Sequence, residues 1–452
     1  MTTAAVILAA GLGTRMKSAL PKMLHPVAGR PMILYGVGSA RALGAESIVV
    51  VIGHGADKVR EVVGDGVIYA IQPEPLGTGH AVMQAEPMLR GRADTVLVFY
   101  GDMPMLRAEA LAQLAQTHRD TGATLTLLTL LADDPMGFGR ILRDANGRVT
   151  GIVEDALATP EQKSIRELNC GVYCFRADWL WPSLGKLRKS PKGEYFLTDL
   201  LEMAVAEGQR VEAVTTEDAE QMLGINDRTH LARAESIARR RIAERHMLGG
   251  VTFQDPASIY VDADVEIGVD TVILPNTHLQ GKTRIGGRCR IGPNTIVRDS
   301  QIGDDCEVKA SVVEEAVLEE HVGIGPFAHL RKGAYLARGV HMGNFGEVKN
   351  SRLGPGAKMG HFSYLGDADV GADVNISAGT ITCNFDGERK HRTVIEDGAF
   401  IGSDTMLVAP VRIGKGARTG AGSVVTHDVP PDTVAYGVPA RPHPRKRQES
   451  KK

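Results

Sequence analysis

The chain has 452 residues, enough for two or three domains, and its formal net charge is only -2. With 23% charged residues of both signs, the composition predicts neither nucleic acid nor a membrane surface as a partner. Five scattered cysteines without a CxxC pair argue against a disulfide framework or a zinc site and favour the cytoplasm. No apolar run approaches membrane-spanning length, and the N-terminal run follows no basic leader, so we interpret it as a first strand.

The first half of the chain alternates short apolar runs with helical patterns. The apolar runs predict strands at residues 6–8, 47–52, 67–71, 95–100 and 124–131. The patterns between them predict helices at residues 31–43, 56–63, 79–89 and 108–121. This alternation is typical of a doubly wound, Rossmann-like α/β domain with a mostly parallel sheet, expected over residues 1–226. Ligands of such sheets bind beyond the carboxyl ends of the strands, so the loops after the strands form the candidate site.

The first of these loops, residues 8–24, reads LAAGLGTRMKSALPKML. Gly11 and Gly13 allow backbone N–H groups to turn toward an anion, and Arg15 and Lys22 add positive charge, which suits a nucleoside triphosphate. A GxG after a strand is by itself equally typical of a tight turn, and this loop matches neither a dinucleotide fingerprint nor a Walker A motif. With Arg15 and the Pro21–Lys22 pair, it resembles the nucleotidyltransferases that activate sugar 1-phosphates.

Two further loops extend this pattern. Residues 72–80 read QPEPLGTGH, in which an amide followed by glycines suits a pyrimidine base, although a glycine-rich turn before a helix is as good an interpretation. The strand at residues 95–100 ends in Gly101 and Asp102, where a carboxylate can hold Mg²⁺. A helix cap or turn is the usual role of such an aspartate, but two phosphate-type loops precede this one and favour the metal.

Polar and glycine residues near later strand ends extend the resemblance to the bacterial bifunctional enzymes that make UDP-N-acetylglucosamine. The resemblance implies that UTP and its product are bound by Leu8, Ala9, Ala10, Gly11, Arg15, Lys22, Gln72, Gly77, Thr78, Tyr100, Gly101 and Asp102. It implies that Gly139, Glu154, Asn169 and Asn226 bind the sugar, and that Asp102 and Asn226 hold Mg²⁺. The reaction would be in-line attack of a sugar-1-phosphate oxygen on the α-phosphorus of UTP, with pyrophosphate as the leaving group.

Residues 227–247 predict a helical linker. Asp227 can cap a helix whose apolar positions recur at three- and four-residue steps. Three consecutive arginines, residues 239–241, could contact nucleic acid, but a solvated helix face is the simpler interpretation.

From residue 248 to residue 452 the chain follows a six-residue period. Aliphatic residues recur at every sixth position over residues 261–297, 324–348, 353–365 and 395–413, with a break between the first two runs. This period fits neither a helix nor an alternating strand. It is typical of a left-handed parallel β-helix of hexapeptide repeats, in which the periodic residues stack inward. A β-sandwich with chance spacing would not give seven consecutive matches.

Polar residues off this period suggest a second site. Arg331 and Lys349 suit a phosphate, and Tyr364 and Asn375 suit sugar hydroxyls. His361 lies among them, and an imidazole can accept a proton near neutral pH. A passive scaffold or an oligomerisation module is the alternative, which the repeats alone do not exclude.

The period breaks again at residues 381–390, ITCNFDGERK, which predicts a loop leaving the coil. This stretch, with RLGPGAKMGHFSYLGDADVG before it, resembles the acetyltransferase half of the same bifunctional enzymes. The resemblance implies a homotrimer in which Arg331 and Lys349 bind the phosphate of glucosamine 1-phosphate, Tyr364 and Asn375 bind its sugar, and His361 is the base. Acetyl-CoA would lie along Ala378, Asn384, Phe385, Lys390, Ser403, Ala421 and Arg441.

Two departures from the family pattern stand out. Phe385 replaces a frequent tyrosine, and VAYGVPARPHP does not align cleanly with the family segment that brings an arginine to the cofactor, which leaves Arg441 a candidate. Cys383 is interpreted as structural, because direct acetyl transfer needs no acyl-carrying thiol.

The sequence therefore predicts one enzyme with two successive activities. Acetylation of glucosamine 1-phosphate would supply the N-acetylglucosamine 1-phosphate that uridylyl transfer consumes, and by resemblance the product feeds peptidoglycan and lipopolysaccharide (lipid A) synthesis. Two alternatives stay open: a single-activity nucleotidyltransferase that the β-helix only assembles, and a non-enzymatic scaffold that senses nucleotide sugars.

Overall fold

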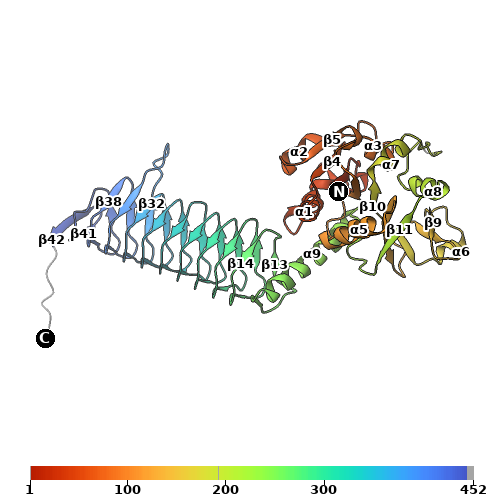
Figure 1. Ribbon diagram of the computed structural model, residues 1–452. Coiled ribbons are helices and arrows are strands. Elements are labelled where there is room, and N and C mark those ends of the chain that lie inside the picture. Colours follow the sequence, from red (N-terminus) through yellow and green to blue (C-terminus); the bar gives the residue numbers. More distant parts are fainter. Residues whose placement is uncertain (1, 192, 445–452) are drawn as a thin grey trace. The chain divides into compact units, whose positions relative to one another are not determined.

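A computed structural model describes residues 2–191 and 193–444 (Figure 1). The chain divides into two compact units, Met1–Ala238 and Arg239–Lys452. The division falls inside the helix α9 (Arg228–Leu248). Within the described ranges, no helix combines the length and the apolar character needed to cross a membrane.

The N-terminal unit is built on a mixed sheet with the strand order β11-β7-β10-β6-β1-β4-β5. These strands are β1 (Thr3–Ala9), β4 (Ser47–Ile52), β5 (Ile68–Ile71), β6 (Thr95–Tyr100), β7 (Leu125–Leu131), β10 (Glu167–Arg176) and β11 (Val211–Thr216). β1 pairs in parallel with both β4 and β6, so the predicted doubly wound, mostly parallel sheet is confirmed. β10 enters between β6 and β7 in the antiparallel direction, which the sequence analysis did not predict.

Helices and two hairpins complete this unit. The hairpins pair β2 (Pro26–Val27) with β3 (Arg30–Pro31) and β8 (Arg140–Arg143) with β9 (Val149–Val153). The helices are α1 (Met32–Ala42), α2 (Ala56–Val63), α3 (Thr78–Met83), α4 (Glu86–Leu89), α5 (Ala108–Thr121), α6 (Pro160–Lys163), α7 (Ala177–Leu184) and α8 (Asp199–Ala206). The single helix predicted at residues 79–89 is wrong. It divides into α3 and α4 because Pro87 lies in the first turn of α4 and has no N–H to continue the helical ladder.

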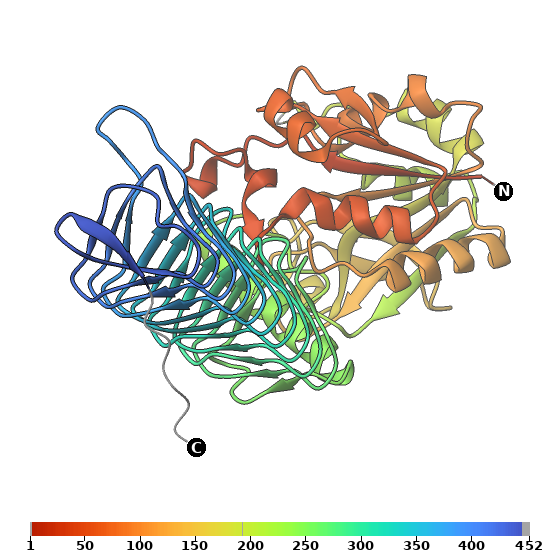
Figure 2. The same ribbon diagram turned by 90° about the vertical axis from the view of Figure 1, so that its left-hand side faces the viewer.

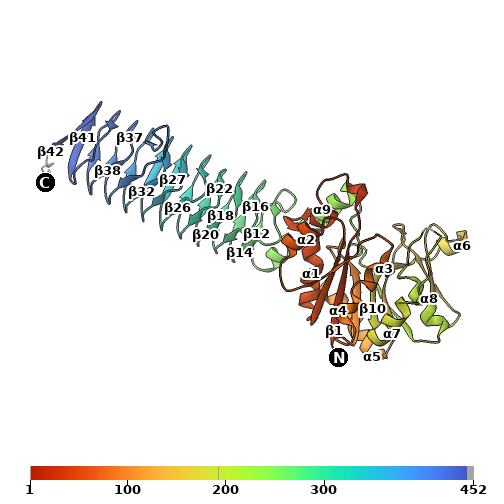
Figure 3. The same cartoon turned by 90° about the horizontal axis from the view of Figure 1, so that it is seen from above.

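The C-terminal unit is a parallel β-helix with three sheets, and each coil contributes one strand to each sheet (Figure 3). The first sheet contains β12 (Thr252–Phe253), β15 (Val272–Ile273), β18 (Arg290–Ile291), β21 (Glu307–Val308), β24 (Gly323–Ile324), β27 (His341–Asn344), β30 (Lys358–His361), β33 (Asn375–Ile376), β36 (Phe400–Ile401), β39 (Arg418–Thr419), β41 (Thr433–Gly437) and β42 (Ala440–Pro444). The second contains β13 (Tyr260–Val261), β16 (His278–Gln280), β19 (Ile296–Arg298), β22 (Val312–Glu314), β25 (His329–Leu330), β28 (Glu347–Lys349), β31 (Tyr364–Gly366), β34 (Ile381–Cys383), β37 (Met406–Val408) and β40 (Val424–Val425). The third contains β14 (Glu266–Ile267), β17 (Arg284–Ile285), β20 (Gln301–Ile302), β23 (Val317–Leu318), β26 (Tyr335–Leu336), β29 (Arg352–Leu353), β32 (Ala368–Val370), β35 (Thr393–Ile395) and β38 (Val411–Ile413).

The six-residue period marks the inward side of these strands. Nearly all its aliphatic residues are buried, such as Ile291 and Val348, which are completely buried, although Ile267 is only half-buried. Where the period breaks, the coil itself continues, since Val297 pairs with Val313 in the next coil. The coils there advance by 17 positions, as from Ile285 to Ile302, or by 16, as from Ile302 to Leu318, instead of the 18 positions of three complete six-residue repeats. The inward positions are filled by Ile302, Val308, Val313 and Leu318.

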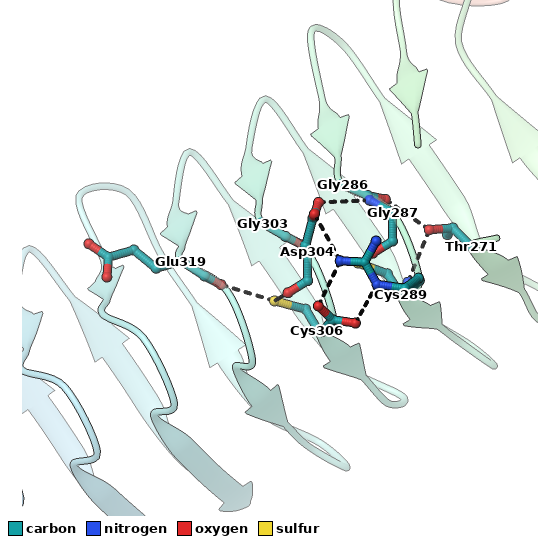
Figure 4. A network of polar contacts seen from close by, with 10 residues as sticks. Thr271, Gly286, Gly287, Cys289, Gly303, Asp304, Cys306 and Glu319 are labelled. Atoms are coloured by element: carbon teal, nitrogen blue, oxygen red, sulfur yellow. Dashed lines mark hydrogen bonds and ion pairs between the residues drawn. The ribbon is translucent and has the colours of Figure 1, made fainter. Parts of the chain in front are cut away.

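Hydrogen bonds at the corners connect successive coils (Figure 4). Asp304 Oδ1 accepts from Gly287 N at 2.9 Å, in the neighbouring coil. The buried thiols take part in the same ladder, because Cys289 Sγ donates to Gly303 O at 3.1 Å and Cys306 Sγ donates to Glu319 O at 3.0 Å. All five cysteines of the chain are free, and these two act as buried donors within the scaffold.

One loop leaves the β-helix where the period was interrupted. It connects β34 to β35 and protrudes from the coils in Figure 2. A bridge between Phe385 and Lys390 closes its base, and Asp386 caps its turn by accepting from the backbone N–H groups of Glu388 and Arg389, each at 2.8 Å. The predicted departure of residues 381–390 from the coil is therefore seen from residue 384 onward.

Candidate active sites

Four predicted residues meet beyond the carboxyl ends of β1 and β6. Lys22 Nζ donates to Asp102 Oδ2 at 2.5 Å and to Asn226 Oδ1 at 3.1 Å. Arg15 Nη2 donates to the same Asn226 oxygen at 3.0 Å. The predicted metal ligands and the predicted phosphate-binding cations therefore form one cluster, although they come from three distant segments.

Two positions in this region require glycine, because other residues pack directly against their Cα atoms. Gly13 has a φ of +61°, and a Cβ at this position would lie 2.6 Å from Lys22 Cβ. Gly77 has a φ of +96°, and a Cβ there would lie 2.5 Å from the Tyr195 carbonyl oxygen. A larger residue at either position would displace Lys22 or the segment around Tyr195.

Two cavities share a wall formed by Thr78, Tyr100, Asp102, Glu194 and Phe196. The larger has a volume of about 900 Å³, and its lining also contains the predicted residues Gly139, Glu154, Asn169 and Asn226. The smaller has a volume of about 280 Å³, and its lining also contains the predicted residues Leu8, Ala10, Gly11, Lys22, Gln72 and Gly77. Predicted sugar ligands thus gather in one cavity and predicted nucleotide ligands in the other. Ala9, Gly101 and Arg15 line neither cavity.

The cavity side chains are held by neighbours. Gln72 is buried, and its Nε2 donates to the Gly77 carbonyl at 3.0 Å and lies 3.1 Å from His80 Nδ1. Asn169 Nδ2 donates to the buried Tyr173 hydroxyl at 2.8 Å. These bonds fix the direction of both amides before any ligand binds.

Electrostatics distinguish Glu154 from Asp102, two of the four acidic residues that line the large cavity. Burial, and then the negative charge of Asp199, raise the pKa of Glu154. Burial, and then Glu202, raise the pKa of Asp199 in turn. Asp102 instead carries the positive partner Lys22. The charge of Glu154 is therefore less compensated by protein cations than that of Asp102, so hydrogen-bond donors on a bound ligand would stabilise it.

Several cavity residues were missed by the sequence analysis. Phe138 and Leu157 supply apolar wall, and Glu194 and Phe196 belong to a segment that packs against Gly77 through Tyr195. The aromatic pair in GEYFLTD between two helical patterns is the only sequence signal that could have drawn attention to this segment.

In the β-helix, four predicted residues occupy one corner of successive coils. His361, Ala378, Ser403 and Ala421 lie in line. The register that pairs Lys358 with Asn375 sets His361 beside Ala378. Asp404 N donates to the Ala378 carbonyl and Gly422 N to the Ser403 carbonyl, each at 2.8 Å, which continues the line. His361 and Ala421 are exposed, and the two between them are half-buried. We call this line the corner column.

A second predicted group lies on the second sheet, beyond the corner residues Phe362 and Ser363. Lys349 and Tyr364 belong to the paired strands β28 and β31, and the neighbouring Lys390 and Arg331 cations lower the pKa of Lys349. Arg331 Nη1 pairs with Glu347 at 2.7 Å. Glu347 pairs with only one of the three cations, and at Lys349 the repulsion from Lys390 and Arg331 outweighs the attraction of Asp367, so the group is suited to an anion.

The remaining predicted residues are more dispersed. Asn384 Nδ2 donates to Asp367 Oδ2 at 2.5 Å. Asn384 Nδ2 and Tyr364 Oη both lie next to the Cα of Gly366. Asn375 lies on β33 in the first sheet, where its Nδ2 donates to Ser377 Oγ at 3.3 Å. Phe385 is exposed on the protruding loop. Arg441 lies on the terminal strand β42, opposite Tyr436.

Comparison with known proteins agrees with this division of the chain. The family model described as "Nucleotidyl transferase" matches residues 4–224, and "Bacterial transferase hexapeptide (six repeats)" matches residues 392–427. The protein named "Bifunctional protein GlmU" of Pelobacter propionicus is 48% identical over 437 residues, covering 96% of this chain and 95% of its own length. The chain belongs to the bifunctional GlmU family.

Other GlmU proteins match along the same length. Those of Trichlorobacter lovleyi and Stutzerimonas stutzeri are each 49% identical and cover 96% of this chain and 95% of their own length. The chain is thus a transferase in both halves, with a nucleotidyltransferase unit followed by a hexapeptide-repeat acyltransferase unit. This excludes a β-helix that only assembles the enzyme, and a purely non-enzymatic scaffold.

Proposed function

We propose that this GlmU-family enzyme makes UDP-N-acetylglucosamine in two steps through the residues described above. The observation that carries the proposal is the pair of separate constellations, one around Lys22, Asp102 and Asn226 and the other around His361. Each has the chemistry that one step needs. UTP and acetyl-CoA are cytoplasmic co-substrates, so we assign the enzyme to the cytoplasm.

For uridylyl transfer, UTP lies in the smaller cavity and N-acetylglucosamine 1-phosphate in the larger. The phosphate oxygen of the sugar attacks the α-phosphorus in line, and pyrophosphate leaves. Lys22 and Arg15 neutralise phosphate charge, Gln72 contacts the uracil, and Glu154 and Asn169 orient the sugar. The acceleration comes from positioning and charge neutralisation, since no covalent intermediate is needed.

Mg²⁺ fits the donor set beside these residues. The Asp102 carboxylate and the Asn226 amide oxygen are both hard oxygen ligands that accept from Lys22, and the Asn226 oxygen also accepts from Arg15. Within the described residues there is no cluster of three or more His, Cys, Asp or Glu suited to a metal. Phosphate and water would therefore supply most of the remaining ligands, as is usual for Mg²⁺. When bound, the ion would neutralise charge on the triphosphate.

For acetyl transfer, Arg331 and Lys349 hold the phosphate of glucosamine 1-phosphate, with Tyr364 and Asn375 at its sugar. His361 accepts the proton of the attacking amine, and acetyl-CoA lies along the corner column toward Ala421. The corner column and the cation group lie on different sides of one corner and are open to solvent. A homotrimer in which a neighbouring copy covers them would complete the site.

Two full-length variants test the assignment. Asp102→Asn should lower pyrophosphate release from UTP and N-acetylglucosamine 1-phosphate by about 100-fold or more and leave CoA-thiol release unchanged. His361→Gln should do the reverse, lowering thiol release with glucosamine 1-phosphate by about 100-fold or more. His341→Gln, an exposed histidine on β27, is the matched control and should change neither rate. Native thiol release by His361→Gln would refute the base assignment.

A further inference from the structure

His361 contacts an asparagine that the sequence analysis did not select. Asn344 Oδ1 and His361 Nδ1 are 2.5 Å apart. The two residues are register partners on the adjacent parallel strands β27 and β30. Phe362 N also donates to the Asn344 carbonyl at 3.1 Å. Their side chains therefore meet from two backbones that are already tied together.

The backbone does not account for an asparagine at this position. Asn276 and Asn294 form a similar pair in earlier coils, with Nδ2 and Oδ1 3.1 Å apart, but both adopt a left-handed φ that favours asparagine. Asn344 does not have a positive φ, and the left-handed corner position falls on Phe345 instead. The contact with His361 is therefore what explains an amide side chain at position 344.

The residues that follow the pair restrict its movement. Phe345 and Phe362 occupy equivalent left-handed corner positions, and their ring centroids are 4.9 Å apart in a stacked arrangement. Phe327 extends the stack, with its centroid 5.4 Å from that of Phe345. Each ring anchors the strand end that carries Asn344 or His361.

The chemistry follows from the donor and acceptor roles. An amide oxygen only accepts hydrogen bonds, so the imidazole nitrogen that faces it must carry the proton. Nδ1 of His361 is then the donor, and Nε2 keeps its lone pair. We infer that Asn344 is a positioning residue for acetyl transfer, which holds His361 in the tautomer whose Nε2 accepts a proton. This inference rests on the proposed role of His361 as the base.

The proton balance of the step requires this tautomer. The amine nitrogen of glucosamine 1-phosphate forms a bond to the thioester carbonyl carbon, and its N–H proton passes to Nε2. The C–S bond breaks, its electron pair stays on the CoA sulfur, and the sulfur leaves as a thiol after taking a proton. With the opposite tautomer, Nε2 would already carry a proton and could not act as the base.

A neutral amide also differs usefully from a carboxylate here. An aspartate at position 344 would still accept from Nδ1, but its negative charge would favour the imidazolium, which has no lone pair to accept a proton. The acidic limb of the pH–rate profile should therefore move to higher pH in Asn344→Asp. The titratable residues on the surrounding strands, besides His361 itself, are His341, Lys358, Glu347, Lys349 and Tyr364. The native enzyme and the variant share them.

The test compares thiol release by the full-length native enzyme and its variants. Asn344→Ala should lower kcat by about 10–100-fold, with KM for acetyl-CoA and for glucosamine 1-phosphate each within about twofold. Asn344→Asp should have most of the native kcat at high pH, and the acidic limb of its pH–rate profile should lie at higher pH than in the native enzyme. Pyrophosphate release measured on the same preparations should stay at the native rate, which shows that the chain is folded. Asn276→Ala is the matched asparagine control and should match the native enzyme in both assays.

Coupling between the two residues decides the outcome. In the His361→Gln background, Asn344→Ala should cause no further loss, because the asparagine acts only through the histidine. A native kcat in Asn344→Ala, an unmoved pH profile in Asn344→Asp, or a further loss in the double variant would each overturn the inference. If His361→Gln itself released thiol at the native rate, the proposed function of His361 would fail instead, so the two failures are distinguishable.

Discussion

The two halves of this protein assemble their candidate sites in opposite ways. In the N-terminal unit, Lys22 reaches Asp102 across 80 positions of sequence and Asn226 across 204, because crossover connections return each strand to one sheet edge. In the β-helix, Asn344 and His361 are 17 positions apart, one coil of the repeat. The first arrangement depends on the whole fold of its unit, and the second only on local register.

The difference has a consequence for how each site is enclosed. The wound sheet and its loops surround a cavity of about 900 Å³ with residues from many segments. The β-helix instead displays side chains at one corner, where His361 and Ala421 are exposed. A solenoid presents residues in straight lines but does not fold back over them, so enclosure must come from its inserted loop or from a second copy.

The largest effect should come from the most distributed cluster. Lys22→Met removes the ammonium shared by Asp102 and Asn226 and should lower pyrophosphate release by about 10²–10³-fold. Thiol release should not change, because the β-helix builds its site from its own coils. Lys17→Met, an exposed lysine in the same loop, should leave both rates at the native level. A parallel fall in both activities would show that the two sites are not independent.

A smaller effect should follow from the cation group of the β-helix. Lys349→Met removes one of the three cations that lie close together and should raise KM for glucosamine 1-phosphate by about 10-fold, while KM for acetyl-CoA stays constant. Lys332→Met is the matched control, since Lys332 already pairs with Glu315 at 2.6 Å. An increase in the acetyl-CoA KM alone would contradict this assignment and would show that Lys349 binds acetyl-CoA instead of the sugar phosphate.

The same contrast explains what could be predicted from the sequence. The inward residues of the β-helix follow from spacing alone, because each coil repeats the environment of the one before, and Ile291 and Val348 are indeed buried. The strands of the N-terminal unit also follow from their apolar runs. The position of β10 does not, because a strand's own residues do not specify which neighbours it will pair with.

Residues that act through contacts were the hardest to predict. Asn344 has no distinguishing sequence context among the asparagines of the repeat, and its relation to His361 appears only when two coils are placed in register. Phe196 joins the cavity wall through a loop whose path is set by distant contacts at Gly77. Motifs identified candidate substrate-binding residues by resemblance, whereas the residues that support them required coordinates.

Alanine substitutions at two glycines can separate the effect of backbone strain from the effect of a displaced site residue. Gly171 has a φ of +72°, and a Cβ there would lie 2.3 Å from the Tyr100 ring. Gly171→Ala should therefore displace Tyr100 and lower pyrophosphate release by about 10-fold. Gly147→Ala, with a φ of +78° and open space around it, should share only the backbone penalty of about 1–2 kcal/mol. Equal activities of the two variants, measured beside their thermal melts, would rule out Tyr100 as the route of the effect.

The smallest effect concerns stability and has a defined sign. Because burial and Asp199 raise the pKa of Glu154 in the folded enzyme, the ionised side chain opposes folding at neutral pH. That penalty is absent below the ordinary carboxyl pKa of about 4.3 and grows as pH rises through the raised value. Glu154→Gln should therefore raise Tm at pH 7.5, and the gain should vanish as pH falls toward 4, while KM for N-acetylglucosamine 1-phosphate increases.

Glu161→Gln is the control and should lower Tm at pH 7.5, since backbone and Thr159 hydrogen bonds lower the pKa of Glu161. A lower Tm for Glu154→Gln at pH 7.5 would mean that protein contacts already compensate this charge, and that the cavity does not depend on a ligand to do so.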